Sequence, residues 1–235
     1  MLHSGKYGTI EKVRQVINNL FDIKYLVGRK RPKILCLGAH PDDIEIGCGG
    51  TILRIIKEIP EVQFYWVVFS GDLERAEEAK KSAELFLKDV VSKVTNFKDF
   101  RESYFPFVGA EIKDFFEEMK RDLFPDIIFT HYADDAHQDH RLLSSLTWNT
   151  FRNNFILEYE IPKYDGDLGN PNLYFQIDQY IVQKKVEIIC DVFKSQKAKK
   201  WFDEETFTSF LRIRGIESNS SSKYAEAFHC RKIIF

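Results

Sequence analysis

The chain has 235 residues, a formal net charge of −2 and 30% charged residues. This length suits one large domain or at most two small ones, and the near-neutral charge offers no basic surface to attract nucleic acid. The longest purely apolar run, Phe64 to Phe69, is far too short to span a bilayer. The four cysteines form no CxxC pair, which indicates a reduced, cytoplasmic protein.

Regular spacing of apolar residues predicts most of the elements in chain order. Residues 10–26 predict a helix within an N-terminal extension, 1–31. Residues 33–38 form a short apolar run that ends in glycine, typical of a buried strand. A helix is predicted to open at Gly49 and to stop at Pro60, and 62–70 is the clearest strand. The later elements are helices over 73–87, 111–123, 139–153, 184–193 and 203–214, strands over 126–130, 156–159 and 224–235, and loops over 160–175 and 216–223.

Strand and helix alternate three times before residue 153, which predicts an α/β fold with a mostly parallel sheet covered by helices. We find no internal repeat and no domain boundary, so a single domain over 1–235 is expected. Ligands of such sheets sit beyond the carboxyl ends of the strands. We therefore expect the loops 160–175 and 216–223 to lie near a site at that edge.

The segment 38–43, Gly-Ala-His-Pro-Asp-Asp, follows directly on the first predicted strand. One histidine and two adjacent carboxylates supply two kinds of metal ligand. Neighbouring side chains of extended chain point apart, so Asp42 and Asp43 can take separate tasks, one binding metal and one handling protons. The same residues also fit an ordinary turn in which an aspartate caps the next helix.

A second cluster contains three of the six histidines, His131, His137 and His140, within ten residues that follow another predicted strand. If a helix begins near Asp139, His137 and His140 are spaced to face one point. The alternative is a solvated acidic loop with capping residues.

The two clusters together indicate more than either alone, because both follow strands of the same predicted sheet. They offer His40, Asp43 and one histidine from 137–140. Three protein ligands plus water are the pattern of a catalytic zinc site, whereas a structural site closes with four. Such a metal would polarise a carbonyl and lower the pKa of water towards ~7. A free carboxylate would then serve as general base, and a spare histidine would steady the tetrahedral intermediate or protonate a leaving amine.

On these residues the sequence resembles the PIG-L/LmbE-like metal-dependent N-deacetylases, which remove acetyl from N-acetylglucosamine-type groups on sugars and sugar conjugates. The resemblance spans roughly residues 33–230 and implies a Rossmann-like, LmbE-like single domain. It differs at Gln138, where the family's HPDH form has proline. The residues that carry it are Ala39–Asp43 with Glu45–Thr51, His137–Arg141, Arg75 with Glu78, and Tyr224–Phe228.

The resemblance implies a role for each residue of the two clusters. His40, Asp43 and His140 would bind one Zn²⁺ per chain, with another divalent metal as the alternative. Asp42 would be the general base. His137 would stabilise the oxyanion or act as the acid. Asp139 would orient His137 or another site histidine through a hydrogen bond.

Residues around this set receive simpler interpretations. Arg75 would contact substrate by resemblance, or else be an exposed helix charge paired with Glu74 or Glu78. His131 is interpreted as a strand-end histidine bonded to backbone. The glycines of 47–50 lack the pattern of a phosphate-binding loop, and close backbone packing explains them better.

We therefore expect a zinc-dependent hydrolase that removes acetyl from an N-acetylated sugar or sugar conjugate, with no nucleic-acid partner and no membrane span. A homo-oligomer is compatible with the sequence. One alternative is a hydrolase of another amide or of a phosphoester, for which Asp134 and Asp135 could supply a second metal's carboxylates. Another is a non-catalytic sugar-binding protein, against which the intact residue set argues.

Overall fold

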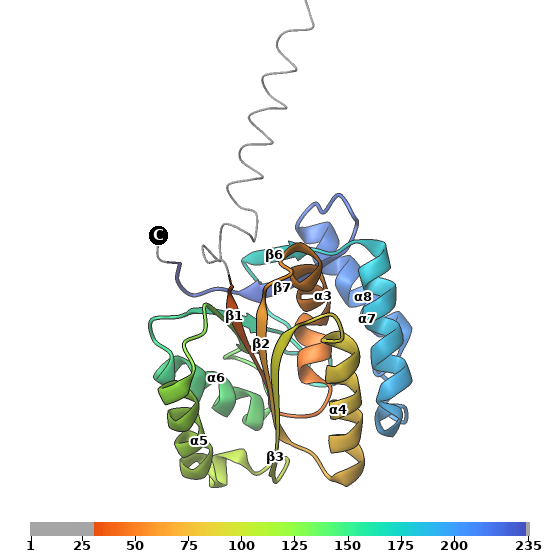
Figure 1. Ribbon diagram of the computed structural model, residues 1–235. Coiled ribbons are helices and arrows are strands. Elements are labelled where there is room, and N and C mark those ends of the chain that lie inside the picture. Colours follow the sequence, from red (N-terminus) through yellow and green to blue (C-terminus); the bar gives the residue numbers. More distant parts are fainter. Residues whose placement is uncertain (1–30, 234–235) are drawn as a thin grey trace, which may run out of the picture.

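A seven-stranded sheet organises residues 31–233, which are the residues that the computed structural model describes (Figure 1). The strand order is β3-β2-β1-β4-β5-β7-β6. The first five strands pair in parallel, and β7 pairs antiparallel with β5 and β6. The mostly parallel α/β sheet expected from the sequence is confirmed. The strands are β1 (Lys33–Gly38), β2 (Gln63–Ser70), β3 (Ser92–Phe100), β4 (Ile127–His131), β5 (Phe155–Tyr159), β6 (Leu173–Gln176) and β7 (Ala225–His229).

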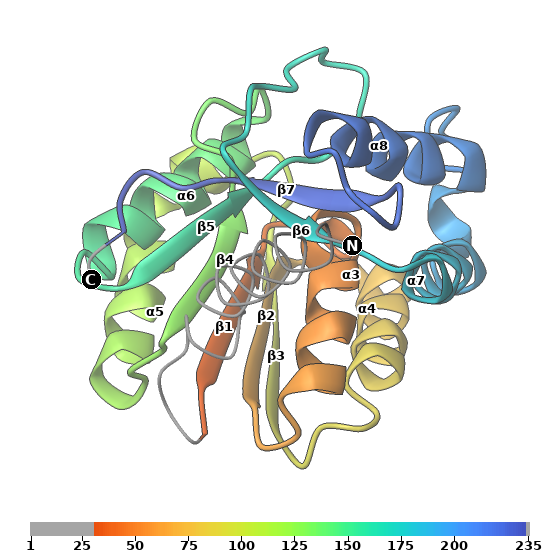
Figure 2. The same cartoon turned by 90° about the horizontal axis from the view of Figure 1, so that it is seen from above.

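Helices cover both faces of this sheet, and a separate apolar cluster fills each side (Figures 1 and 2). One face carries α5 and α6, and the other carries α3, α4, α7 and α8. No helix within 31–233 is long and apolar enough to cross a membrane. The helix predicted over 10–26 lies outside the described residues. The helices are α3 (Asp43–Glu58), α4 (Leu73–Phe86), α5 (Gly109–Asp122), α6 (Gln138–Thr150), α7 (Gln179–Val192) and α8 (Glu204–Glu217), with short 3₁₀ turns η1 (Phe105–Phe107) and η2 (Lys194–Gln196).

The two central strands, β1 and β4, are neighbours in the sheet although they are not consecutive in the chain. From β1 the chain continues through α3 to β2 on one side, whereas β4 continues through α6 to β5 on the other. The connections therefore part at the carboxyl ends of β1 and β4, which is where open α/β sheets form a ligand crevice. Both sequence clusters begin at these two strand ends.

Helix α3 begins at Asp43, so the predicted start at Gly49 is wrong. The helix contains glycine at these positions because the surrounding side chains leave no room for a Cβ atom. A Cβ on Gly47 would lie 2.1 Å from Cδ2 of Tyr159, and one on Gly50 would lie 2.8 Å from Oε1 of Glu226. Close backbone packing is therefore confirmed as the reason for these glycines.

Two strands were not predicted. The edge strand β3 is largely exposed, and its sequence mixes lysine, threonine and asparagine with single apolar residues, so it shows no apolar run. Strand β6 overlaps the end of the predicted loop 160–175, pairs only with β7 and has one buried residue, Phe175.

The loop 216–223 does not lie near the site, contrary to the sequence expectation. Ser221 Oγ donates to Oε1 of Gln176, and Nη1 of Arg54 donates to the Gln176 carbonyl. These contacts place the loop beside the C-terminal half of α3, at the edge of the molecule opposite the carboxyl ends of β1 and β4 (Figure 1). The loop after β5, in contrast, lies at that carboxyl edge, where Lys163 contacts Asp135 and Asp167 binds the Ala136 N–H.

Replacing Gly47 with alanine is expected to lower the free energy of unfolding by about 1–3 kcal/mol, because the new methyl group must displace the buried Tyr159 ring. Urea unfolding would measure this change. Gly109→Ala is the matched control, since a Cβ there meets only Leu142 at an ordinary 3.8 Å. Equal stability of the two variants would contradict the proposed packing requirement.

Candidate metal centre

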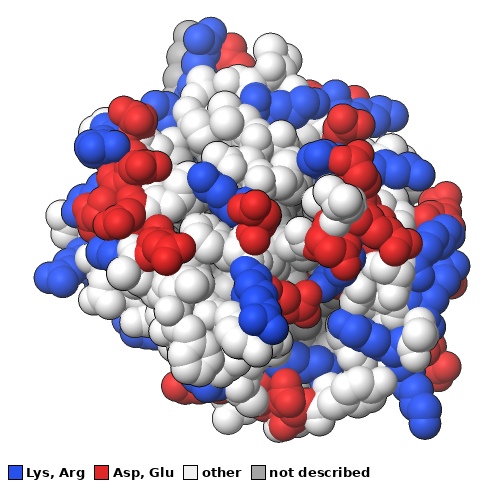
Figure 3. Space-filling view, turned by 90° about the horizontal axis from the view of Figure 1, so that it is seen from below, with Lys and Arg blue, Asp and Glu red and all other residues white. Residues whose placement is uncertain are grey.

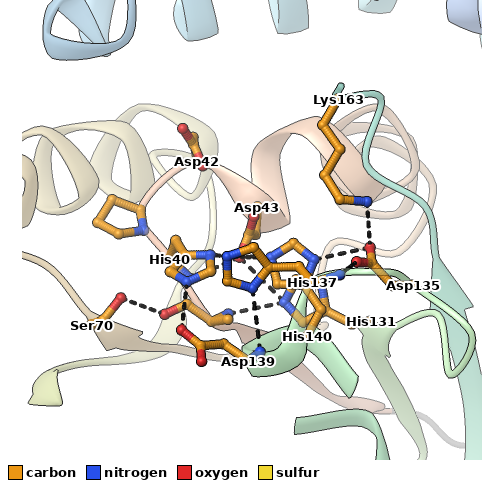
Figure 4. Close-up of polar contacts among 12 residues, drawn as sticks. His40, Asp42, Asp43, Ser70, His131, Asp135, His137, Asp139, His140 and Lys163 are labelled. Atoms are coloured by element: carbon orange, nitrogen blue, oxygen red, sulfur yellow. Dashed lines mark hydrogen bonds and ion pairs between the residues drawn. The ribbon is translucent and has the colours of Figure 1, made fainter. Parts of the chain in front are cut away.

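Histidines and carboxylates from two loops meet at the carboxyl edge of the sheet (Figure 4). His40 comes from the turn between β1 and α3, Asp43 is the first residue of α3, and His137 and His140 come from the start of α6. His40, Asp43 and His140 are buried, whereas His137 is partly exposed. Seen from this edge, acidic and basic side chains both gather around the middle of the face (Figure 3).

The three residues predicted to bind metal bring one ligand atom each to a common point. His40 Nδ1 lies 3.1 Å from His140 Nε2 and 3.4 Å from Asp43 Oδ2. His140 Nε2 lies 3.5 Å from the same Asp43 oxygen. A tetrahedral ion with bonds of ~2.0–2.1 Å separates its ligand atoms by roughly 3.4 Å. The triangle therefore has the dimensions of a zinc-type site.

The tautomer of His40 is fixed by Asp139. His40 Nε2 lies 3.1 Å from Asp139 Oδ2, and this carboxylate also accepts the Ser103 and Phe105 N–H groups at 2.6 and 3.1 Å. Burial would raise the pKa of Asp139, but the hydrogen bonds from His40 and Ser103 hold it below its usual value. An ionised Asp139 accepts the Nε2–H of His40, so Nδ1 is the His40 atom that can release its proton and present a lone pair to a metal ion.

Asp135 orients His140 in the same way. Its Oδ2 lies 2.9 Å from His140 Nδ1, and its Oδ1 accepts the His137 N–H at 2.7 Å. Despite burial, the hydrogen bond from His140 keeps the pKa of Asp135 below its usual value. His140 Nδ1 therefore carries the proton, and His140 Nε2 presents its lone pair to Asp43. This is the carboxylate–histidine arrangement that supports metal ligands.

The result is two imidazole lone pairs and a carboxylate oxygen facing one another in a buried place, an arrangement that only a cation relieves. Burial lowers the pKa of His40, but the Asp43 charge and the hydrogen bond to Asp139 outweigh it and raise that pKa to about 10. Burial and the charge of His131 lower the pKa of His140 to about 3, so this ring stays neutral. The demand for positive charge at this point means that the residues fit a metal ion.

Two overlapping groups among the described residues have ligand atoms close enough to hold an ion: His40 with His137 and His140, and Asp43 with His131 and His140. His131 Nε2 accepts the Ala39 N–H at 3.0 Å, so its lone pair is already used. The interpretation of His131 as a histidine bonded to backbone is confirmed. His137 accepts the Asp139 N–H through Nδ1 at 3.3 Å, which leaves its Nε2 available beside the cluster.

Asp42 lies beside the ring cluster at the N-cap of α3 (Figure 4). Its φ of 101° falls in the region that favours glycine, so the backbone is strained at this turn. Burial raises the pKa of Asp42 to about 7, although the nearby Arg75 charge opposes the shift. Asp42 is thus a buried carboxyl that exchanges a proton near neutral pH.

Arg75 is buried, so its alternative interpretation as an exposed helix charge paired with Glu74 or Glu78 is wrong. Its Nη2 donates to the Pro41 carbonyl at 2.9 Å and lies 3.6 Å from Asp42 Oδ2. Its Nη1 donates to Glu102 at 2.5 Å. The guanidinium thus braces the strained turn that carries Asp42.

Sequence reasoning missed several residues that support the site. Asp135 was considered only as a ligand for a second metal, and nothing in the sequence pointed to Lys163, whose Nζ lies 3.0 Å from Asp135 Oδ2. The buried Lys185 donates to Glu226 and to the Ile46 carbonyl, at 2.7 Å in both cases. A lysine in a loop or in an amphipathic helix carries no local signal of such a contact.

Three comparisons place this arrangement among known proteins. The model of the PIG-L family, described as GlcNAc-PI de-N-acetylase, matches residues 35–151. The uncharacterized deacetylase YaiS of Escherichia coli K12 is 28% identical over 146 residues, which cover 57% of this chain and 76% of that protein.

The solved structures with the same fold have different activities. N,N'-diacetylchitobiose deacetylase from Pyrococcus horikoshii superposes with a TM-score of 0.62 and 20% identity, covering 98% of this chain and 94% of that one. GalB, the 4-carboxy-2-hydroxymuconate hydratase from Pseudomonas putida KT2440, superposes with a TM-score of 0.69 and 16% identity, covering 87% and 98%. At these identities the likeness establishes the fold alone, and the chemistry must be argued from the site.

Replacing Asp139 with asparagine is expected to weaken Zn²⁺ binding about 10–100-fold, because an amide cannot accept all the N–H groups that now fix His40. Competition against a chromophoric chelator would measure the affinity. Asp134→Asn serves as the control, since the exposed Asp134 contacts the Tyr132 hydroxyl rather than the cluster. Unchanged affinity in Asp139→Asn would show that His40 is not a ligand held by this carboxylate.

Proposed function

Because the chain belongs to the PIG-L family of de-N-acetylases, we propose that it is a metal-dependent hydrolase that removes acetyl from an N-acetylated sugar or sugar conjugate. The observation that carries the proposal is the meeting of His40 Nδ1, Asp43 Oδ2 and His140 Nε2 within 3.5 Å of one another. The free state of all four cysteines supports a reducing, cytoplasmic location.

We propose zinc as the metal, held by His40, Asp43 and His140. Two imidazoles and one carboxylate suit zinc and leave a position open for chemistry, and the same set is also used by iron(II). When bound, the ion would act as a Lewis acid that polarises the amide carbonyl and lowers the pKa of water. Asp139 and Asp135 would keep both imidazoles in the tautomer that binds it.

Asp42 is proposed as the general base. Its pKa of about 7 allows it to be ionised before reaction and to accept a proton from the attacking water. Arg75 keeps the Asp42 turn in place through the Pro41 carbonyl. Arg75 is also proposed to contact substrate, because the exposed Glu102 that it binds can give way to a substrate group.

His137 is proposed to stabilise the oxyanion of the tetrahedral intermediate. Its Nδ1 accepts the Asp139 N–H, so a neutral ring carries its proton on Nε2, beside His40 and His140. Burial and the charge of His40 lower the pKa of His137, which favours this neutral form. An N–H donor in that position strengthens its hydrogen bond as negative charge develops on the carbonyl oxygen.

The contacts of the acidic loop argue against the phosphoesterase alternative. A two-metal site needs further carboxylates that converge on the ions. Asp135 instead faces the Nδ1 atom of His140, and Asp134 is exposed next to Tyr132. Among the described residues, Asp43 is the only carboxylate in the groups that could hold an ion.

Metal removal gives the first functional test. The purified protein is expected to contain about one divalent ion per chain, to lose acetate release after chelation and to regain it with Zn²⁺. Elemental analysis and an acetate assay over N-acetylhexosamine donors, free and carrier-linked, would measure both. Full turnover in the chelated, metal-free protein would contradict the proposal.

Asp42→Asn provides the second test. Acetate release is expected to fall at least ~100-fold, because the amide cannot take the proton from water. The metal content should remain at the wild-type level, since Asp42 is not among the three proposed ligands. A variant that retains full turnover would refute the assignment of the base.

A further inference from the structure

The loop that follows β5 carries Lys163, whose side chain contacts a carboxylate of the metal centre. Its Nζ lies 3.0 Å from Asp135 Oδ2, the same oxygen that lies 2.9 Å from His140 Nδ1 (Figure 4). The Lys163 side chain is only 10% exposed and the Asp135 side chain only 3%. The ammonium group and the imidazole of a proposed metal ligand therefore share one acceptor in a place with little water.

A second carboxylate holds Lys163 in position. Asp167 Oδ2 accepts from Lys163 Nζ at 2.5 Å and from the Ala136 N–H at 2.6 Å. The loop after β5 is thus held to two consecutive residues of the turn before α6. Lys163 binds the Asp135 side chain, and Asp167 binds the Ala136 backbone. A lysine that only made the loop soluble would extend into water, whereas Lys163 is nearly buried and contacts the Asp135 oxygen that orients His140.

We propose that Lys163 is a positioning residue that sets the affinity of the metal centre by withdrawing charge from Asp135. The inference deepens the proposed function, because it concerns the regulation of that same site. Lys163 acts through Asp135 and His140 and does not itself touch the metal or the substrate.

The expected direction follows from the sharing of the acceptor. An ionised Asp135 draws the Nδ1 proton of His140 and makes Nε2 a stronger electron donor. The Lys163 ammonium competes for the same Oδ2 atom and weakens this pull. This competition weakens metal binding and leaves the bound ion more electrophilic, which favours its role as a Lewis acid.

The test is the Zn²⁺ affinity of Lys163→Gln, measured by chelator competition. Glutamine keeps a donor to Asp135 but removes the charge, so we expect binding ~3–10-fold tighter than in the wild type. A purely structural role, in which Lys163 only holds the loop, predicts weaker binding. Lys163→Arg should return the affinity to the wild-type value, because it restores the charge. Lys80→Gln, on an exposed pair with Glu77, is the matched control.

A double-mutant cycle with Asp135→Asn shows whether the effect passes through Asp135. Asparagine should weaken Zn²⁺ binding by itself, and adding Lys163→Gln to it should then change the affinity less than twofold, because there is no anion left to compete for. A Lys163→Gln effect of the same size in both backgrounds would overturn the inference. Unchanged or weaker Zn²⁺ binding in the single variant would overturn it as well.

The design separates this inference from the proposed function. Zn²⁺ affinity is measured without substrate, so the result stands whether or not acetate is released from any donor. Absence of metal binding by the wild type would refute the proposed function and the inference together. Circular dichroism would confirm folding, and Lys163→Met gives the same charge removal if the glutamine variant does not fold.

Discussion

Three potential metal-ligand atoms meet in a buried part of this protein, and the surrounding structure is arranged to keep them there. His40 Nδ1 and His140 Nε2 approach to 3.1 Å while the carboxylate of Asp43 faces both. Such a contact is repulsive unless a cation occupies it. Asp139 and Asp135 prevent the simplest escape, in which a ring turns its N–H toward its neighbour, because each carboxylate already holds that N–H on the far side.

The fold supplies this contact by fixing α3, the helix that carries Asp43. Glu226 of β7 accepts the Gly50 and Thr51 N–H groups at 2.7 and 2.6 Å, and Lys185 of α7 binds both Glu226 and the Ile46 carbonyl. A charged pair with 2% exposure is acceptable only when its polar atoms have hydrogen-bond partners, as each of them has here. The missing side chain at Gly50 allows the carboxylate to reach the helix backbone. The motif Tyr224–Phe228, which contains Glu226, therefore helps to position the metal centre.

Sequence reasoning succeeded where local patterns reflect burial. The buried strands β1, β2, β4 and β5 were found because they form apolar runs, and the two residue clusters could be placed because they follow β1 and β4 directly. The edge strand β3 has no such run, and the start of α3 was hidden by glycines whose reason lies in side chains distant in sequence. Lys163 and Lys185 could not be found, because their partners are brought to them by the tertiary fold alone.

The charges of the site, like its geometry, require a cation among the ligand atoms. Burial raises the pKa of Glu45 to about 8, so this residue is neutral at pH 7. The other buried carboxylates around the ligand atoms are Asp42, Asp43, Asp135 and Asp139. Two cations, Arg75 and Lys163, lie against them. Arg75 also binds Glu102 and Lys163 also binds Asp167, so negative charge is in excess around the ligand atoms, and in a poorly hydrated site that excess must be met by a divalent ion or by protons. The proton that His40 otherwise binds so strongly occupies the place of that ion, which explains why one histidine in the cluster is basic while its neighbour is not.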